Sequence, residues 1–306
     1  MSGRVLLDRT VRIGLLWALV GVVLWSFSLP FTKAAVEGFN PFTVAAGRGV
    51  IAGLLAAPVL VLTRRRFPPR HLWGPLAWTA LGAMLGWPLL LALALQYTTS
   101  AHAAVIAAAL PLATAVLAVA FGGERVTRIF WFAAALGTLT LMVYSASRGG
   151  LADGGWLPDL LLIGAVIGAS WSYVQGAAAS RELPGWEVIS WIAALTLPIT
   201  VPVALITWLA TRTDYETSAG SWTALILLGV SSAYLGFFAW YRGLAMAGTA
   251  YGGQMQQLQA PLTLVWSALL LGEVITWGTF LAAMIVVIAV ALAQASRAPT
   301  IVVPEE

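Results

Sequence analysis

The chain is built from long apolar runs joined by short polar connections. Crossing a hydrocarbon layer of about 30 Å takes roughly 20 helical residues at a rise of about 1.5 Å each. Because backbone groups in lipid must form their hydrogen bonds within the protein, each run of this length is predicted to be a helix. The ten expected spans cover residues 13–35, 42–62, 72–96, 101–121, 128–147, 158–180, 186–209, 220–242, 250–271 and 275–295.

Composition excludes a water-soluble protein. Hydrophobic residues make up 60% of the 306 positions and charged residues only 9%, whereas roughly 25% of the residues of a soluble domain are charged. The net charge of +4 does not indicate nucleic-acid binding, because the arginines lie in short clusters between apolar runs. The absence of cysteine excludes disulfides and Cys-ligated metals. We therefore expect no metal, no cofactor and no nucleic-acid partner, and no obligate protein partner is indicated.

The distribution of lysine and arginine predicts the orientation, because positive loops resist translocation. With the N-terminus in the cytoplasm, twelve of the sixteen positive residues fall on the cytoplasmic side: Arg4, Arg9, Arg12, Arg64, Arg65, Arg66, Arg70, Arg125, Arg128, Arg181, Arg242 and Arg297. The first apolar run is longer than a signal-peptide core and is predicted to be retained. We expect an integral protein of a bacterial plasma (inner) membrane with both termini in the cytoplasm.

One pattern occurs twice in the chain. A proline inside an apolar run, followed by a Gly-Glu pair at the end of the run, occurs from Pro111 to Glu124 and again from Pro261 to Glu273. Each glutamate is followed by another apolar run that ends in Ala-Ser-Arg. Five spans per half is an odd number, so the second half must insert upside down relative to the first. We predict an all-α integral membrane protein with ten transmembrane helices in two inverted five-helix repeats, residues 1–148 and 149–306, forming one structural unit.

Two shorter similarities keep the same order in both halves. Trp78–Leu81 in the third span matches Trp222–Leu225 in the eighth, and Trp25–Phe27 in the first span corresponds to Trp171–Tyr173 in the sixth. With the proline and Gly-Glu pattern, this arrangement resembles the drug/metabolite transporter (DMT) superfamily, specifically its EamA-type ten-helix branch. The tryptophan-rich first and sixth spans are most similar to the YddG-type exporters of aromatic amino acids. The resemblance implies efflux of small metabolites by alternating access, with a central cavity near the prolines.

All twelve acidic residues fall at span ends, in loops or in tails. Many proton-driven carriers couple proton binding to substrate release through a buried carboxylate. Its absence here disfavours proton antiport and makes facilitated diffusion the expectation. Glu124 and Glu273 lie between two helices, where each carboxylate can accept backbone amides and face the positive end of the following helix. We interpret both as structural turn residues, with the preceding glycine allowing the tight turn.

Several side chains within the spans are candidates for lining a substrate cavity, although ordinary packing explains each of them as well. Four are aromatic residues that sit deep in their spans. Neutral amides in the sixth and ninth spans suit a zwitterionic ligand or, alternatively, hydrogen bonds between helices. The candidates are Trp25, Trp87, His102, Trp171, Gln175, Tyr234, Gln254 and Gln257. Pro111 and Pro261 each remove a backbone donor in mid-helix and are hinge candidates or simple kinks.

Two further sequence features concern charge and helix faces. Arg48 lies two turns into the second span, where an unpaired charge costs roughly 2.5 to 3.5 kcal/mol, so it must snorkel, find a partner or reach the cavity. In an α-helix Gln254 and Gln257 point roughly opposite to Gln256 and Gln259. Either side of the ninth span would therefore place polar amides in lipid, at a cost in free energy.

The leading hypothesis is a carrier that moves small amphipathic solutes, best matched by aromatic or apolar amino acids, by alternating access. A DMT-type carrier of nucleotide sugars, phosphorylated sugars or drugs is an alternative, although an anion site should hold several central lysines or arginines. An intramembrane enzyme is a weaker alternative, because the spans contain no H-E-x-x-H pair and no aspartate pair. We therefore predict a transporter and not an enzyme, with a small molecule and the lipid bilayer as its partners.

Overall fold

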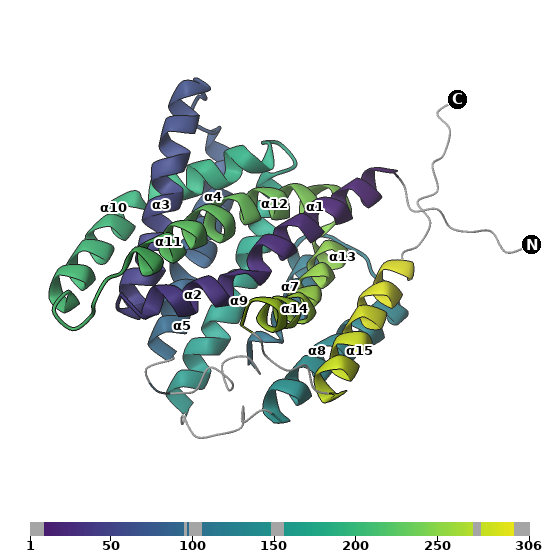
Figure 1. Ribbon diagram of the computed structural model, residues 1–306. Helices are drawn as coiled ribbons and strands as arrows, with labels where there is room; N and C mark the ends of the chain where they lie inside the picture. The colour runs from purple at the N-terminus through teal and green to yellow at the C-terminus, as the bar shows by residue number, and fades with distance from the viewer. Residues whose placement is uncertain (1–8, 95–96, 98–105, 148–155, 272–276, 297–306) are drawn as a thin grey trace, which may run out of the picture.

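The computed structural model describes residues 9–94, 97, 106–147, 156–271 and 277–296. All regular structure in these residues is helical (Figure 1). The elements up to residue 147 are α1 (Arg9–Ser26), α2 (Ser28–Val36), α3 (Pro41–Leu62), η1 (Arg70–Leu72), α4 (Trp73–Thr79), η2 (Ala80–Gly86), α5 (Trp87–Ala94), α7 (Leu110–Phe121) and α8 (Arg128–Ser145). From residue 156 onward they are α9 (Trp156–Ala179), α10 (Gly185–Thr211), α11 (Ala219–Leu227), η4 (Leu228–Leu235), α12 (Gly236–Ala247), α13 (Thr249–Gly253), η5 (Gln254–Leu258), α14 (Gln259–Leu271) and α15 (Trp277–Ala295).

Every apolar run expected from the sequence is helical over most of its described residues. Six helical stretches in the described part of the chain are long and apolar enough to cross a membrane: Arg9–Ser26, Pro41–Leu62, Arg70–Leu91, Trp156–Ala179, Gly185–Thr211 and Ala219–Ala247. Shorter apolar helices are Leu110–Phe121, Arg128–Tyr144 and Phe280–Ala295. Large apolar side chains face outward on these helices, with Leu62 and Trp277 each 80% exposed, as lipid-facing positions require.

Helix starts follow ordinary capping chemistry. The side chain of Asn40 accepts a hydrogen bond from the amide of Phe42 at the start of α3, and Thr127 does the same for Phe130 at the start of α8. Ser218 and Ser221 form a reciprocal capping box at the start of α11. These side chains satisfy amides that have no partner within their own helix.

Irregular segments interrupt five of the expected spans over their described residues, including the fourth, which has a turn at residues 108–109. The first span breaks at Phe27 between α1 and α2, and the ninth contains a 3₁₀ segment, η5. The third and eighth spans each contain a π-helical segment near their middle, η2 and η4. A π-helical turn inserts extra backbone into a helix and is common at functional sites.

The most extensive helix pairings join segments that are far apart in the sequence. α3 packs along α10, α1 along α12, α8 along α15, and α2 against α11. α9 packs against α7 and against the continuous stretch of α4, η2 and α5. Figure 1 shows α8 and α15 as a peripheral pair at the lower right, apart from the α3 and α10 pair at the upper left. Each of these pairings joins a helix before residue 148 to one after residue 155.

Small residues allow the closest of these approaches. A Cβ atom added at Gly82 of η2 would lie 2.2 Å from the carbonyl oxygen of Gly168 on α9. One added at Gly243 of α12 would lie 2.5 Å from the backbone nitrogen of Ala18 on α1. Small residues at such contacts let helix backbones approach closely in a membrane, where packing takes the place of the hydrophobic effect between helices.

Candidate functional site

Four aromatic side chains from three helices form a buried group that we call the aromatic cluster: Trp25, Tyr173, Phe237 and Trp240. The rings of Trp25 and Tyr173 are stacked with centroids 6.0 Å apart, and Trp25 lies 4.9 Å from Phe237 and 5.0 Å from Trp240. Trp25 and Tyr173 are each only 5% exposed. The cluster therefore joins α1, α9 and α12 through ring contacts within the core.

The π segment η4 connects the aromatic cluster to a positive charge. The indole Nε1 of Trp25 donates to the carbonyl oxygen of Ser232 at 2.9 Å. The hydroxyl of the same serine accepts a hydrogen bond from Nη2 of Arg48 at 3.0 Å. Arg48 belongs to α3, so its guanidinium reaches across to η4 instead of extending toward a membrane surface. Ser232 is thus a bridge between the cation and the cluster.

The glutamines of the ninth span divide between two sides, as their spacing predicts. On one side, Gln254 donates from Nε2 to the carbonyl oxygen of Pro111 at 3.1 Å and accepts at Oε1 from Nε2 of Gln257 at 2.6 Å. Gln254 is 0% and Gln257 1% exposed. The 3₁₀ geometry of η5 explains their direct bond, because side chains three residues apart are eclipsed in a 3₁₀ helix. This pair ties the ninth span to α7.

On the other side, two glutamines approach the aromatic cluster. Gln256 donates from Nε2 to the hydroxyl of Tyr173 at 3.3 Å, and Gln259 donates to the carbonyl oxygen of Trp25 at 3.4 Å. Farther along α14, Nε1 of Trp266 donates to the hydroxyl of Ser26 at 2.8 Å. The ninth span therefore meets the end of α1 through neutral polar groups, next to stacked rings.

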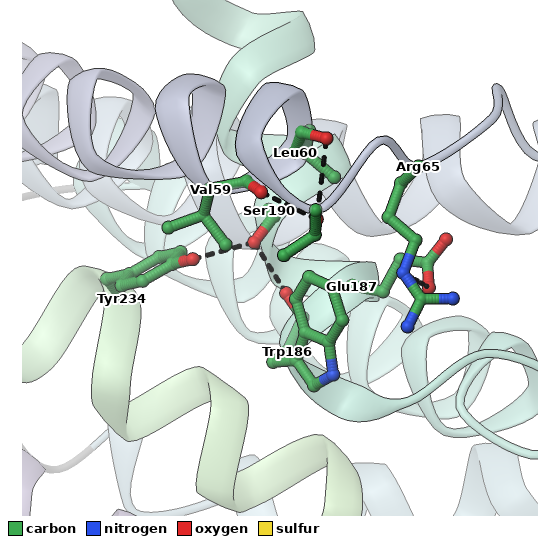
Figure 2. A network of polar contacts seen from close by, with 8 residues as sticks. Val59, Leu60, Arg65, Trp186, Glu187, Ser190 and Tyr234 are labelled. Atoms are coloured by element: carbon green, nitrogen blue, oxygen red, sulfur yellow. Dashed lines mark hydrogen bonds and ion pairs between the residues drawn. The ribbon is translucent and has the colours of Figure 1, made fainter.

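Tyr234 lies in a separate polar network (Figure 2). Its hydroxyl is 2.7 Å from the hydroxyl of Ser190, which also donates to the carbonyl oxygen of Trp186 at 2.6 Å. In the same view Nε of Arg65 forms an ion pair with Glu187 at 3.4 Å. The carboxylate side chain is 5% exposed and that of Arg65 44%. This network joins α10 to η4 and to the segment that follows α3.

The other candidate residues are placed in different parts of the structure. Trp87 is the first residue of α5 and packs, partly buried, against the core that contains Trp25. Trp171 is half-buried and points away from the cluster, in edge contact with Phe121 at 5.3 Å. Gln175 is half-buried on α9. His102 and Glu273 lie outside the described residues.

Pro111 lies in the first turn of α7 and not in mid-helix as expected, whereas Pro261 lies inside the continuous helical stretch formed by α13, η5 and α14. α7 begins at Leu110, so Pro111 is near its start, and Pro261 is the third residue of α14. Proline is tolerated at position 111 because the amides of the first turn have no partner within the helix. The backbone irregularity precedes each proline, at residues 108–109 and in η5.

Glu124 accepts two backbone amides, from Thr249 at 2.5 Å and from Ala250 at 2.8 Å. These amides begin α13 in the other half of the chain, whereas the helix that follows Glu124 is capped by Thr127. Glu124 therefore accepts backbone amides of α13 and not those of the helix that follows it, where Thr127 accepts the amide of Phe130. Gly123 has a φ of 68°, a left-handed conformation that glycine adopts without steric cost.

The sequence pattern missed Tyr173 as the partner of Trp25. The matching tripeptides paired Trp25 with Trp171, but the structure stacks Trp25 on Tyr173, two positions later. Leu228 follows Ala80 by the same number of residues as Tyr173 follows Trp25, and Ala80 and Leu228 are the first residues of the two π segments. The segments that match in sequence are separated by 144, 146 and 149 residues, so no consistent offset in the sequence singled out Tyr173.

The site offers ring faces, amides and one cation, which are groups that can bind a ligand. No group of three or more potential metal-ligating side chains occurs among the described residues. The described acidic side chains lie at helix ends or in connecting segments, away from the aromatic cluster. Stacked rings present apolar faces, while amides can both donate and accept hydrogen bonds.

Comparisons with known proteins add the following matches. The model of the EamA-like transporter family matches residues 12–146 and again residues 156–294. The uncharacterized transporter YdeK of Bacillus subtilis (strain 168) is 37% identical over 278 residues, which cover 90% of this chain and 94% of that protein. A protein of known crystal structure has a TM-score of 0.74 at 18% identity and covers 92% of this chain and 98% of its own. At that identity the last likeness concerns the fold alone.

Proposed function

The chain belongs to the EamA-like transporter family, and from that premise we propose that it carries small amphipathic metabolites across the membrane by alternating access. Its proposed substrate class is the aromatic or apolar amino acids, as in the YddG-type exporters. The observation that carries this proposal is the aromatic cluster beside the neutral amides of η5 and α14. Rings can stack on an apolar side chain, and amides can pair with both ends of a zwitterion.

The proposed architecture is ten transmembrane helices in two inverted repeats, residues 1–148 and 149–306. The two matches to one family model and the two corresponding π segments support a duplication. Contacts between connections support the number of crossings. Arg65 pairs with Glu187, and Glu124 with the start of α13, and each pairing joins two connections separated by four expected spans. An even number of crossings brings a chain back to the same side of the membrane.

The proposed orientation places both termini on the cytoplasmic side of a bacterial inner membrane. Because the chain contains no cysteine, single cysteines can report the side of each connection. Cysteine at Asp214 should react with a membrane-impermeant maleimide in right-side-out vesicles, and cysteine at Arg181 should react only after permeabilisation. The reverse pattern would overturn the orientation, and equal labelling of both would contradict the alternation of spans.

Transport is proposed to be facilitated diffusion, in the direction of the substrate gradient. Coupling to protons commonly uses a carboxylate inside the membrane, and the described acidic residues lie at helix ends or in connections. Alternating access would expose the aromatic cluster first to one side and then to the other.

The decisive experiment measures flux into proteoliposomes of labelled phenylalanine, tryptophan, threonine, a sugar phosphate and a cationic dye, with and without a pH gradient. We expect phenylalanine and tryptophan to be taken up at rates that do not depend on the gradient. Uptake of the dye alone, accelerated by the gradient, would contradict both the substrate class and the mechanism. Uptake of the sugar phosphate alone would favour an anion carrier of the same family.

A further inference from the structure

Arg48 is a cation held inside a membrane span by a neutral partner. Its Nη2 donates to the hydroxyl of Ser232, at 3.0 Å, and among the described residues no carboxylate forms an ion pair with it. An unpaired charge at such a position is costly, because the interior of the bilayer solvates it poorly. A single hydrogen bond to a neutral hydroxyl offsets only part of that cost, because it supplies no opposite charge.

The guanidinium lies among core residues and not in lipid. Ser232, its hydrogen-bond partner, is 2% exposed. Arg48 itself nevertheless remains half-buried. Because Ser232 lies on η4, across from α3, the guanidinium is directed toward the interior of the helix bundle.

Most of the hydrogen-bonding capacity of Arg48 is not used by described side chains. A guanidinium carries five N–H donors in a planar fork and no acceptor, and the recorded hydrogen bond uses one nitrogen. The fork matches the two oxygens of a carboxylate, with which it forms short, charge-assisted bonds. The same serine that holds Arg48 also accepts the indole of Trp25, so an anion at the fork would lie beside the aromatic cluster.

We propose that Arg48 binds the carboxylate of the transported solute, so that the carrier requires a substrate with a carboxylate at one end and an apolar group at the other. The apolar group packs on the aromatic cluster. This inference rests on the proposed function and adds what that function leaves open, the group by which the substrate is recognised. It also gives the buried charge the counter-ion that the described protein residues lack.

The test compares three labelled probes in proteoliposomes: L-phenylalanine, 3-phenylpropionate and L-phenylalaninamide. The first two carry a carboxylate, and the third has the same ring without one. Wild-type protein should transport both carboxylates with a kcat/KM at least about tenfold above that of the amide. Arg48→Gln should lower the kcat/KM of the two carboxylates by about 10- to 100-fold, as the loss of a charge-assisted hydrogen bond predicts, and leave that of the amide unchanged.

Two variants separate recognition from structure. Arg48→Lys keeps the charge but loses the planar fork, so its values should lie between those of the wild type and Arg48→Gln. Arg242→Gln is the control, since it removes an exposed arginine that stacks on Trp17 at 4.7 Å, and it should retain wild-type selectivity.

The possible results distinguish the two proposals. Equal transport of phenylalanine and its amide by the wild type would overturn the role of Arg48 while leaving the proposed function intact. A uniform loss for all three probes in a folded Arg48→Gln would mean a structural role and would also overturn it. No transport of any probe by folded wild-type protein would contradict the proposed function and, with it, this inference. If Arg48→Gln does not fold, the wild-type selectivity between carboxylate and amide decides alone.

Discussion

Replacing Glu124 tests whether its carboxylate joins the two halves of the chain. In Glu124→Ala, the amides of Thr249 and Ala250 lose their acceptors, which lie at 2.5 and 2.8 Å. Hydrogen bonds to a charged group contribute about 1.5 to 3 kcal/mol each. Because Glu124 is only half-buried, the lower value applies, and the two bonds together contribute about 3 kcal/mol. At roughly 2 °C per kcal/mol for a chain of this size, the melting temperature should fall by about 6 °C.

The assay is thermal unfolding of the purified protein in detergent, followed by size-exclusion chromatography of the soluble fraction. Glu124→Gln keeps an amide oxygen that can accept hydrogen bonds but loses the charge, so it should lose about half as much stability. Glu216→Ala is the matched control, since that exposed residue lies in the connection before α11 and should change the melting temperature by less than about 1 °C. Equal melting temperatures for Glu124→Ala and Glu216→Ala would refute the reasoning.

Three further predictions follow from packing, the aromatic cluster and charge. Gly82→Ala should lower the melting temperature by several degrees, because the added Cβ would lie 2.2 Å from a backbone oxygen. Gly168→Ala should not lower it, because the atom nearest to its added Cβ lies 4.0 Å away. The same melting assay compares the two variants. Trp25→Phe, which loses the indole hydrogen bond, should raise the KM for phenylalanine uptake by about three- to tenfold, and an equal rise in Trp171→Phe would contradict the placement of the cluster. Glu187→Gln should lower the melting temperature by about 2 °C at low salt. If the difference in melting temperature between this variant and the wild type did not become smaller at high salt, that would argue against an ion pair.

The sequence predicted the helical runs well because membrane insertion is governed by length and hydrophobicity. The ends of α3 and α10 fall within two residues of the expected limits, since a polar or proline-containing turn follows directly on each apolar run. The family was also identifiable, because the proline and Gly-Glu pattern is local in the sequence. Such features depend on neighbouring residues alone.

The irregular segments and the partners of individual side chains were not predictable in the same way. Nothing in the composition of Ala80–Gly86 distinguishes a π segment from an α-helix, because the difference depends on how η2 packs against α9. The partner of Glu124 was assigned to the wrong helix because sequence adjacency favours the helix that follows it. Trp171 looked equivalent to Trp25, but only the rotation of α9 decides which of its aromatic residues faces inward.

The exchange of partners between the two parts of the chain has a consequence for its biosynthesis. α1, α3 and α8 find their most extensive contacts on α12, α10 and α15, which leave the ribosome much later. Until then, the glycine-lined faces of the early helices are exposed to acyl chains in the bilayer. For the same reason, the two parts produced as separate polypeptides should assemble when they are made in one cell, while either alone should be degraded.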